Sequence, residues 1–197
     1  MYARLNYVDL RPELMTELKA FWAERVGAYK GLMKGYLLLE GNTGHSLSVV
    51  FFDTEAAMVE NANATLKGVA KDAAKYRLSE PEVHLRKVMA EVAGNPGPIG
   101  YSRVADVTMK VERLDEVARG WPGHVATYKP ERGFRSAYFC GDAKTGRLAS
   151  ISFWGSKADC EANEKSGAFQ ATVDPYKDMI AIPPKRSYWD VVVVVGK

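Results

Sequence analysis

The feature that most constrains this chain is an internal repeat. The segment Tyr2-Ala-Arg-Leu-Asn-Tyr-Val recurs as Tyr101-Ser-Arg-Val-Ala-Asp-Val, at an offset of 99 residues. The same offset aligns further identical pairs, among them Glu13 with Glu112, Trp22 with Trp121 and Tyr29 with Tyr128. Because these matches keep their order along the chain, we predict two copies of one structural unit.

The later parts of the two copies align after small changes of offset. A one-residue deletion matches Gly35-Tyr36 with Gly133-Phe134, and a longer hairpin in the second copy then matches Thr43-Gly44 with Thr145-Gly146 at an offset of 102. Between the copies, residues 94–100 read Gly-Asn-Pro-Gly-Pro-Ile-Gly, a composition that breaks helices and strands. The predicted organisation is a first unit over residues 1–93, a linker over 94–100 and a second unit over 101–197.

Each copy has the same predicted order of elements. A strand of alternating polar and apolar residues comes first, and a helix with apolar residues at helical spacing follows it. A hairpin with a Thr-Gly turn, a second helix and a closing strand complete the unit. The strands are predicted over residues 2–9, 36–40, 47–52 and 84–92, and over 101–109, 134–139, 148–154 and 189–195. Residues 120–123, Gly-Trp-Pro-Gly, predict a kink or an early end of the first helix in the second copy.

The order of elements defines the fold class. Strand-helix-strand-strand-helix-strand is the ferredoxin-like pattern of an α+β protein, with both helices on one face of an antiparallel sheet. The bare face of such a sheet is apolar and must be covered. We therefore predict two tandem ferredoxin-like βαββαβ units packed sheet-to-sheet as an intrachain dimeric α+β barrel. The pattern predicts this pseudo-dimer within one chain and leaves open a further homodimer through outer helices or strand edges.

Composition and charge limit the partners and the compartment. The formal net charge is +3, and the basic residues are spread along the chain, so neither nucleic acid nor a membrane is a predicted partner. The N-terminal residues lack the layout of a signal peptide, and no apolar run reaches the roughly 18 residues of a membrane span. The protein is therefore expected to be cytoplasmic. The two cysteines, Cys140 and Cys160, form no CxxC motif and are interpreted as reduced, partly buried thiols.

The motifs of several enzyme classes are missing from the sequence. It contains no Gly-rich phosphate loop, no GxSxG elbow, no Cys/His pairing and no acidic metal cluster, which disfavours kinases, hydrolases and nucleotide-dependent dehydrogenases. The three histidines, His45, His84 and His124, lie in separate predicted elements without HxH or HExxH spacing. No metal site is predicted from them.

Several motifs in the two copies are specific enough to compare with known proteins. They are the opening Tyr-Ala-Arg strand, the Gly-aromatic strand starts, the Thr-Gly hairpins and the segment Ile151-Ser-Phe-Trp-Gly-Ser-Lys-Ala158. In these motifs nearly the whole chain resembles the tandem-repeat form of the antibiotic biosynthesis monooxygenase (ABM) family, of the dimeric α+β barrel superfamily. Residues 151–158 are similar to the family's W-x-S-x-x-A junction, of which the first copy keeps only Phe51-Phe-Asp-Thr-Glu-Ala56. Such signatures are more specific for architecture than for chemistry.

The resemblance implies a small barrel pocket in which an electron-rich aromatic compound is oxidised by molecular oxygen without metal or flavin, so no cofactor is expected. The substrate anion can itself pass an electron to oxygen, and the protein need only bind, deprotonate and exclude water. Haem-degrading members of the family use an Asn on a strand, a Trp on the second helix and an iron-binding His later on that helix. Asn6 lies at a comparable place on the first strand. Asn61 and Asn163 occupy the approximate Trp position here, and no His follows, which argues against haem degradation.

The candidate catalytic residues are Asn6, Arg4 and His84. Arg4 and Asn6 share one face of the first strand because side chains alternate, and with Arg103 they are suited to bind an enolate or phenolate oxygen. The alternative is that the arginines lie at a rim or pair with carboxylates. His84 is the best placed histidine for a base, although an ordinary strand-end histidine is the more common case.

The candidate substrate-binding residues are Arg103, Tyr138, Trp154 and Tyr188, whose aromatic members belong to the core in the alternative interpretation. The predicted function is that of a cofactor-independent monooxygenase of the ABM type acting on a small aromatic or polyketide-like compound. Two alternatives remain open: a non-catalytic small-molecule-binding or stress-response barrel protein, and a structural module whose barrel is filled by side chains.

Overall fold

The structure is a computed structural model that describes residues 1–64 and 70–196. It contains two compact units: unit 1 comprises Met1–Lys87 and the end of the chain from Asp190, and unit 2 comprises Val88–Trp189. In chain order the elements are β1 (Tyr2–Asp9), α1 (Met15–Gly27), β2 (Leu32–Leu39), β3 (His45–Phe52), α2 (Glu55–Ala64), α3 (Ala70–Ala74) and β4 (Glu82–Ala93), then β5 (Tyr101–Met109), α4 (Leu114–Val125), β6 (Phe134–Gly141), β7 (Arg147–Trp154), α5 (Lys157–Lys165), α6 (Ala168–Val173) and β8 (Ile180–Gly196). Short 3-10 helices precede α1, α4 and β8 at Pro12–Leu14, Val111–Arg113 and Asp174–Met179, and another follows α4 at Ala126–Tyr128.

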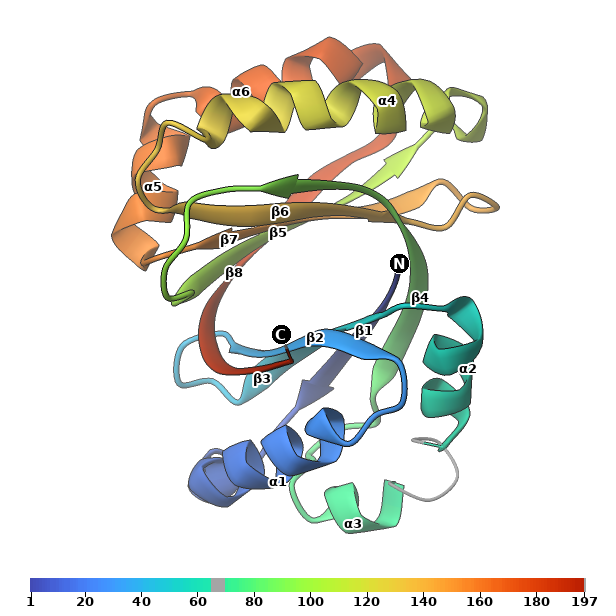
Figure 1. Ribbon diagram of the computed structural model, residues 1–197, viewed down its shortest axis with the longest axis vertical. Coiled ribbons are helices and arrows are strands. Elements are labelled where there is room, and N and C mark those ends of the chain that lie inside the picture. Colours follow the sequence, from blue (N-terminus) through green and yellow to red (C-terminus); the bar gives the residue numbers. More distant parts are fainter. Residues whose placement is uncertain (65–69, 197) are drawn as a thin grey trace. The chain divides into compact units, whose positions relative to one another are not determined.

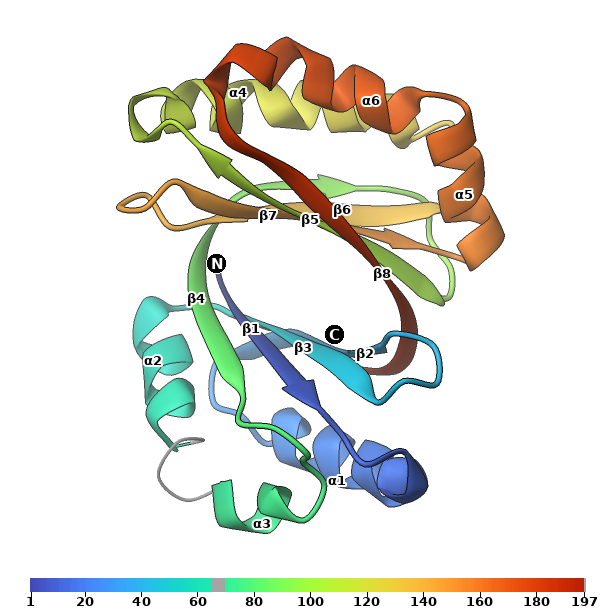
Figure 2. The ribbon, with the colours of Figure 1, turned by 180° about the vertical axis from the view of Figure 1, so that it is seen from behind.

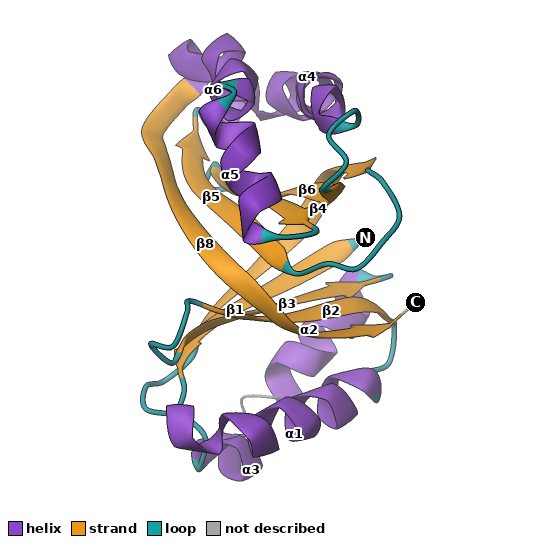
Figure 3. Ribbon diagram, turned by 90° about the vertical axis from the view of Figure 1, so that its left-hand side faces the viewer, coloured by secondary structure: helices purple, strands orange, loops and turns teal. Residues whose placement is uncertain are grey.

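Each unit is built on an antiparallel sheet with its helices on one face. In unit 1, β1 pairs with β3 and β4, and β2 pairs with β3 and with the end of β8. In unit 2, β7 pairs with β5 and β6. Helices α1–α3 cover one face of the first sheet, and α4–α6 cover one face of the second (Figures 1 and 3).

The hydrogen-bonded strand order is β1-β3-β2-β8-β5-β7-β6-β4. The predicted α+β fold class with ferredoxin-like units is confirmed. The division between the two units falls inside β4 and β8, which are the two longest strands (Figure 2). None of the helices in the described part of the chain is long and apolar enough to cross a membrane.

Strand register corrects one part of the repeat alignment. Leu32 lies opposite Phe52 in unit 1, and Phe134 lies opposite Trp154 in unit 2, so the offset is already 102 at the start of β2. The carbonyl of Gly31 accepts a hydrogen bond from Asp53, and that of Gly133 accepts one from Gly155. Gly31 is therefore the counterpart of Gly133, and the predicted match of Gly35 with Gly133 is wrong.

The extra residues of the second copy lie before β6 rather than in its hairpin. Tyr29 and Tyr128 still correspond at an offset of 99, so three residues are inserted between Tyr128 and Gly133. The two hairpin turns have equal lengths, from the end of β2 at Leu39 to His45 and from the end of β6 at Gly141 to Arg147. The longer hairpin predicted for the second copy is thus also wrong.

The Thr-Gly pairs of the repeat have a structural cause. Gly44 and Gly146 adopt φ angles of 83° and 71°, a region that side chains disfavour. Their carbonyls accept hydrogen bonds of 2.8 and 2.9 Å from the backbone of Leu10 and Met109. A Cβ at either glycine would approach the carbonyl oxygen of Leu10 or Met109 within 2.4 Å. Glycine is required because each turn packs against the end of the first strand.

Helix α4 does not end at its proline. It continues to Val125 with Pro122 inside its last turn. An interior proline costs about 3 kcal/mol, but Trp121 and Val125 are 3% and 2% exposed, and burying such side chains contributes about 2 kcal/mol each. Burial on the helix face therefore offsets the proline, and the early end expected from residues 120–123 does not occur.

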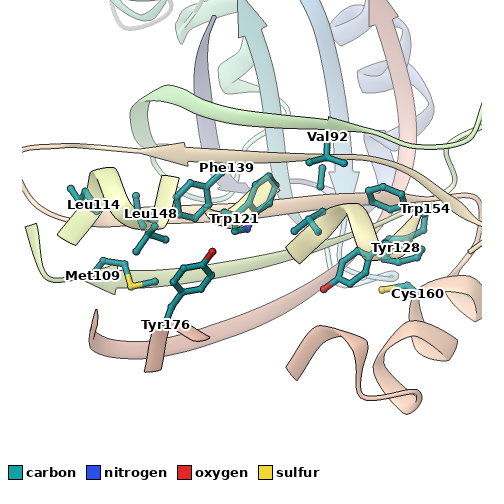
Figure 4. Close-up of a cluster of buried hydrophobic side chains, with 14 of the residues drawn as sticks. Val92, Met109, Leu114, Trp121, Tyr128, Phe139, Leu148, Trp154, Cys160 and Tyr176 are labelled. Carbon is teal, nitrogen blue, oxygen red and sulfur yellow. The ribbon is translucent and has the colours of Figure 1, made fainter. Parts of the chain in front are cut away.

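The core of unit 2 lies between its sheet and helices. Trp121 stacks on Phe139 at 5.1 Å, and Tyr128 packs near Trp154 at 5.9 Å between ring centroids (Figure 4). In unit 1 the residues packed beneath α1 form two smaller clusters, one around Leu18 and Tyr76 and one around Val26 and Phe52. This difference in core packing leaves more space beneath α1 than beneath α4.

Candidate functional site

Unit 1 contains a cavity of about 90 Å³ between the sheet and the helices, hereafter the first cavity. Alternate residues of β1, Arg4, Asn6 and Val8, line its floor, and Trp22 and Arg25 of α1 line its roof. Strand alternation explains why these three β1 side chains share one face. The face is the one covered by helices, so Arg4 and Asn6 do not point to the opposite face of the sheet, where a barrel pocket was expected.

Two polar atoms at the first cavity are buried without a hydrogen-bond partner among the described residues: Oδ1 of Asn6 and Nε of Arg25. The Nη2 atom of Arg25 donates to Asp72 at 2.8 Å, so only part of its guanidinium is engaged. An unpaired buried polar group costs about 1–3 kcal/mol. One acceptor and one donor left in this state at the same cavity are the features expected of a site completed by a ligand.

The first cavity is electropositive. Arg4, Arg25 and Arg77 line it, and no Asp, Glu or His is found among the described residues that do so. Arg4 is 3% exposed, with its guanidinium 5.2 Å from the centroid of the Tyr29 ring. Arg77 lies 3.8 Å from Glu80, and that carboxylate is almost fully exposed. Arg4 would stabilise negative charge on a ligand most strongly, because a buried charge is weakly screened, whereas the Arg25 side chain is 40% exposed and pairs with Asp72.

Further hydrogen-bonding groups lie on the cavity wall. Trp22 donates from Nε1 to Oγ of Ser48 at 3.2 Å, and Oγ of Ser46 donates to the carbonyl of Val8 at 2.6 Å. These bonds fix the wall of the cavity without using Asn6. A ligand therefore meets a preformed set of polar groups in which Asn6 and Arg25 retain unused capacity.

Unit 2 has a second cavity in the equivalent place, of about 50 Å³. Ala105 replaces Asn6 there, and the lining is mostly apolar, with Val107, Trp121 and Phe139 among its members. Arg103, the counterpart of Arg4, donates from Nη1 to Asn163 at 3.0 Å and to Glu164 at 3.2 Å. Its guanidinium also lies 4.3 Å from the centroid of Phe169. Arg103 is thus held by protein groups.

Arg103 is the buried member of a network that reaches the surface. Glu164 accepts hydrogen bonds from the Tyr188 hydroxyl at 2.8 and 2.9 Å and lies 3.6 Å from Arg186. Nδ2 of Asn163 donates to Glu131 at 2.8 Å. Burial, followed by the bond to Glu164, raises the pKa of Tyr188. Tyr188 and Arg103 meet through one carboxylate, so the structure brings together these two sequence-predicted residues.

The other predicted site residues are separated from the first cavity. His84 lies opposite Leu5 on the neighbouring strand, so its side chain is on the face away from Arg4 and Asn6. There it contacts Glu82 at 3.0 Å and the Tyr7 ring at 5.8 Å. Tyr138 lies between Ala137 and Phe139, which line the second cavity, and points to the opposite face, against Phe153.

Trp154 stays close to Arg103. Its ring is 5.7 Å from the Arg103 guanidinium and its Nε1 donates to Ser152 at 2.9 Å. The indole is completely buried, and its hydrogen bond is satisfied within the protein. The Trp154 ring therefore packs near the Arg103 guanidinium and helps to hold it in place.

Sequence reasoning missed Arg25 and Arg77. Arg25 follows Trp22 by three positions and precedes Val26, so it lies on the apolar face of α1. A charged residue on an otherwise apolar helix face is a readable signal. Arg77 gave no comparable signal, because it lies outside the helices and strands, at an isolated bridge to Leu10. Among the residues that the structure describes, no group of three or more potential metal ligands occurs.

The asparagines of the second helices have structural roles. Nδ2 of Asn61 donates to the carbonyl of Ala57 at 2.9 Å, and Asn163 binds Arg103 and Glu131. Asn163 is fully buried. Both side chains are thus occupied by bonds within their own units.

The sequence matches no protein-family model and no curated protein sequence. Solved structures are similar over nearly the whole chain. An anthrone oxidase-like protein is 16% identical with a TM-score of 0.72, covering 98% of this chain and 92% of its own. A presumed monooxygenase from Fusobacterium nucleatum subsp. nucleatum ATCC 25586 is 15% identical with a TM-score of 0.74, covering 100% and 94%.

The name of a third similar structure refers to the ABM family. It is an uncharacterized ferredoxin fold protein related to antibiotic biosynthesis monooxygenases, from Listeria monocytogenes 4b F2365, 11% identical with a TM-score of 0.58 over 98% of this chain and 96% of its own. These similarities define the class: the chain has the α+β fold of ABM-related proteins. The resemblance drawn from the sequence motifs is confirmed at the level of the fold.

Proposed function

We propose that the first cavity binds a small hydroxylated aromatic compound as its anion, and that the protein oxidises this compound with molecular oxygen without metal or flavin. The observation that carries the proposal is the pair of buried, unpaired polar atoms at one cavity, Oδ1 of Asn6 and Nε of Arg25. The monoanion of a catechol satisfies both atoms, because its remaining hydroxyl can donate to Asn6 and its ionised oxygen can accept from Arg25. The fold shared with an anthrone oxidase-like protein and a presumed monooxygenase supports this reaction class.

The arginines promote ionisation of the ligand, a step that a catalytic base would otherwise assist. Positive charges near a phenol or enol favour its ionised form and lower its pKa. With Arg4, Arg25 and Arg77 at the cavity, the ligand ionises on binding and releases its proton to solvent. The resulting electron-rich anion is the species that can donate an electron to oxygen. Its burial away from bulk water protects it from reprotonation.

The overall reaction balances without a further redox partner. The substrate loses two hydrogens and gains one oxygen atom, so that a hydroquinone or catechol becomes a hydroxyquinone and the CH2 group of anthrone becomes a carbonyl. The second oxygen atom leaves as water. Dioxygen is the oxidant and is fully reduced. The protein binds, orients and ionises the substrate. It supplies no electrons itself.

Cavity size limits the substrate. The first cavity, at about 90 Å³, is smaller than the 300–1,000 Å³ typical of drug-sized ligands. A compound with a single aromatic ring is therefore the preferred substrate. The second cavity is smaller still and its arginine is held by Asn163 and Glu164, so we assign the reaction to unit 1.

The test is oxygen uptake by metal-free protein with single-ring hydroquinones and catechols, with anthrone added as the polycyclic member of the panel. Heat-denatured protein corrects for autoxidation. Asn6→Ala is the matched variant, because it installs the residue found at the equivalent position of unit 2. Saturable uptake that Asn6→Ala lowers supports the proposal, and uptake equal to that of denatured protein contradicts the catalytic part.

The second candidate function is non-catalytic binding of the same ligand class. The absence of Asp, Glu and His among the described residues that line the first cavity favours it, because a catalytic proton acceptor is often one of these. Saturable ligand binding without oxygen uptake identifies a binding protein. Uptake that saturates at the same ligand concentration as binding identifies the oxygenase.

A further inference from the structure

A groove on the surface of unit 1 adjoins the first cavity. It lies between α1 and the end of α3 and is open to solvent, with Glu17, Phe21, Lys75 and Tyr76 among its lining residues. Phe21 and Tyr76 line both the groove and the first cavity. These two aromatic rings therefore form the wall between the cavity and the outside of the unit.

The wall is held closed by contacts between the two helical segments. The rings of Phe21 and Tyr76 are 5.1 Å apart between centroids. The Tyr76 hydroxyl donates to Glu17 at 2.9 Å, and Nζ of Lys75 lies 4.7 Å from the centroid of the Tyr76 ring. Tyr76 is 2% exposed. The tyrosine is thus fixed from several sides, whereas Phe21 is held mainly by ring packing and by Arg25, 5.8 Å from the centroid of its ring.

Unit 2 lacks one of the two aromatic side chains that form this wall. Gly120 stands at the position of Phe21, and Tyr176 takes the place of Tyr76. A Cβ at Gly120 would come within 2.6 Å of the Tyr176 hydroxyl, so the space of the missing side chain is partly filled by that oxygen. The paired aromatic wall is therefore a property of unit 1, where the polar cavity also lies.

We infer that Phe21 sets the upper size limit of the ligand that the first cavity accepts. The inference rests on the proposed function, because it concerns ligands of the same site. Removing the ring joins the cavity of about 90 Å³ to the open groove, and the extra length admits a second and third fused ring. Tyr76 forms the fixed side of the passage. Phe21 is a specificity-determining residue rather than a catalytic one.

The experiment measures anaerobic binding of two phenols of different length, 4-methylphenol and 2-hydroxyanthracene, by equilibrium dialysis under argon. In Phe21→Ala, the affinity for the three-ring phenol relative to the one-ring phenol is expected to rise at least tenfold over wild type. Phe21→Leu, which keeps most of the apolar volume, is expected to give a smaller rise. It also allows the affinity ratio to be measured if the alanine variant does not fold.

A control variant separates the size of the first cavity from other effects. Phe169→Ala deletes a phenylalanine ring from the lining of the second cavity and should leave the affinity ratio unchanged. An unchanged ratio in both Phe21 variants, with wild type binding 4-methylphenol, overturns the inference and leaves the proposed function standing. No binding of either phenol to wild type overturns both.

Discussion

Asn6 on β1 and Ala105 on β5 occupy the same position in the two units, and each lies opposite a serine on the neighbouring strand, Ser48 or Ser150. Only Asn6 places a polar group at this position, and its Oδ1 is buried without a partner. The same fold thus carries a polar cavity in unit 1 and a mostly apolar one in unit 2. Because the two copies differ at this pair, mutations in unit 1 and in unit 2 can test ligand binding and stability separately.

Asn6→Ala should weaken binding without destabilising the protein. The substitution removes a hydrogen bond to the ligand, which is worth about 1 kcal/mol and corresponds to roughly fivefold to tenfold in affinity. It also removes an unsatisfied buried acceptor, so the free energy of unfolding should stay equal or rise by about 1 kcal/mol. Urea unfolding and anaerobic dialysis with catechol, whose monoanion keeps one hydroxyl to donate to Oδ1 of Asn6, measure the two effects. A loss of more than about 1 kcal/mol of stability would show that Asn6 is structural.

Arg103→Met should destabilise the protein without changing ligand affinity. Arg103 is buried and binds Asn163 and Glu164, and removing one partner of a buried ion pair typically costs 3–5 kcal/mol. Glu164 is partly exposed and keeps Tyr188 and Arg186, so about 2–3 kcal/mol is expected. Ligand affinity at unit 1 should not change. A variant as stable as wild type would exclude a structural role for this network.

Part of the fold could be predicted from the sequence because the two copies match most closely where their side chains pack together. Arg4 and Arg103, like Tyr29 and Tyr128, keep their spacing because each arginine lies near its tyrosine ring, at 5.2 and 6.0 Å. The loop before β6 was misaligned because Gly35-Tyr36 resembles Gly133-Phe134 by composition alone. Only the strand register, which depends on hydrogen bonds between distant segments, reveals Gly31 as the true counterpart.

The site was less accessible to sequence reasoning. Alternation correctly placed Arg4 and Asn6 on one face of a strand, but it does not say whether helices or another sheet cover that face. His84 was grouped with them by chemical type, and the pairing of β1 with β4 puts it on the opposite face. Arg25 lies at the same cavity although it comes from α1. Contacts of this kind depend on tertiary packing, which local patterns do not encode.

The charge of the first cavity should be visible in the ionisation of a bound phenol. Because Arg4, Arg25 and Arg77 line the cavity, bound 4-nitrophenol should have a pKa about one unit below its value in water. Spectrophotometric titration of the bound phenolate gives this pKa directly. In Arg25→Met, the pKa of bound 4-nitrophenol should rise again toward the free value. If wild type and Arg25→Met give the same bound pKa as water, the electrostatic part of the proposed function fails.

Cys160 should make unit 2 sensitive to alkaline pH. Burial raises the pKa of this thiol from 9.0 to about 12, so between these values the unfolded chain loses a proton that the folded chain keeps. The unfolded state then binds fewer protons, and the free energy of unfolding must fall as pH rises, by about 1.4 kcal/mol per pH unit. The contribution is fully present below pH 9 and is lost as pH approaches 12.

Cys160→Ala isolates this effect from the other groups that titrate at high pH. Burial also raises the pKa of Tyr128, which works in the same direction above pH 10, but Tyr128 is present in both proteins and cancels in the comparison. The variant should be less stable at pH 8 because a buried side chain is shortened. By pH 10.5 its deficit should shrink by about 2 kcal/mol, as wild type loses the thiol contribution. A deficit that stays constant between pH 8 and pH 10.5 in urea unfolding would mean that the Cys160 thiol ionises as readily in the folded protein as in the unfolded chain.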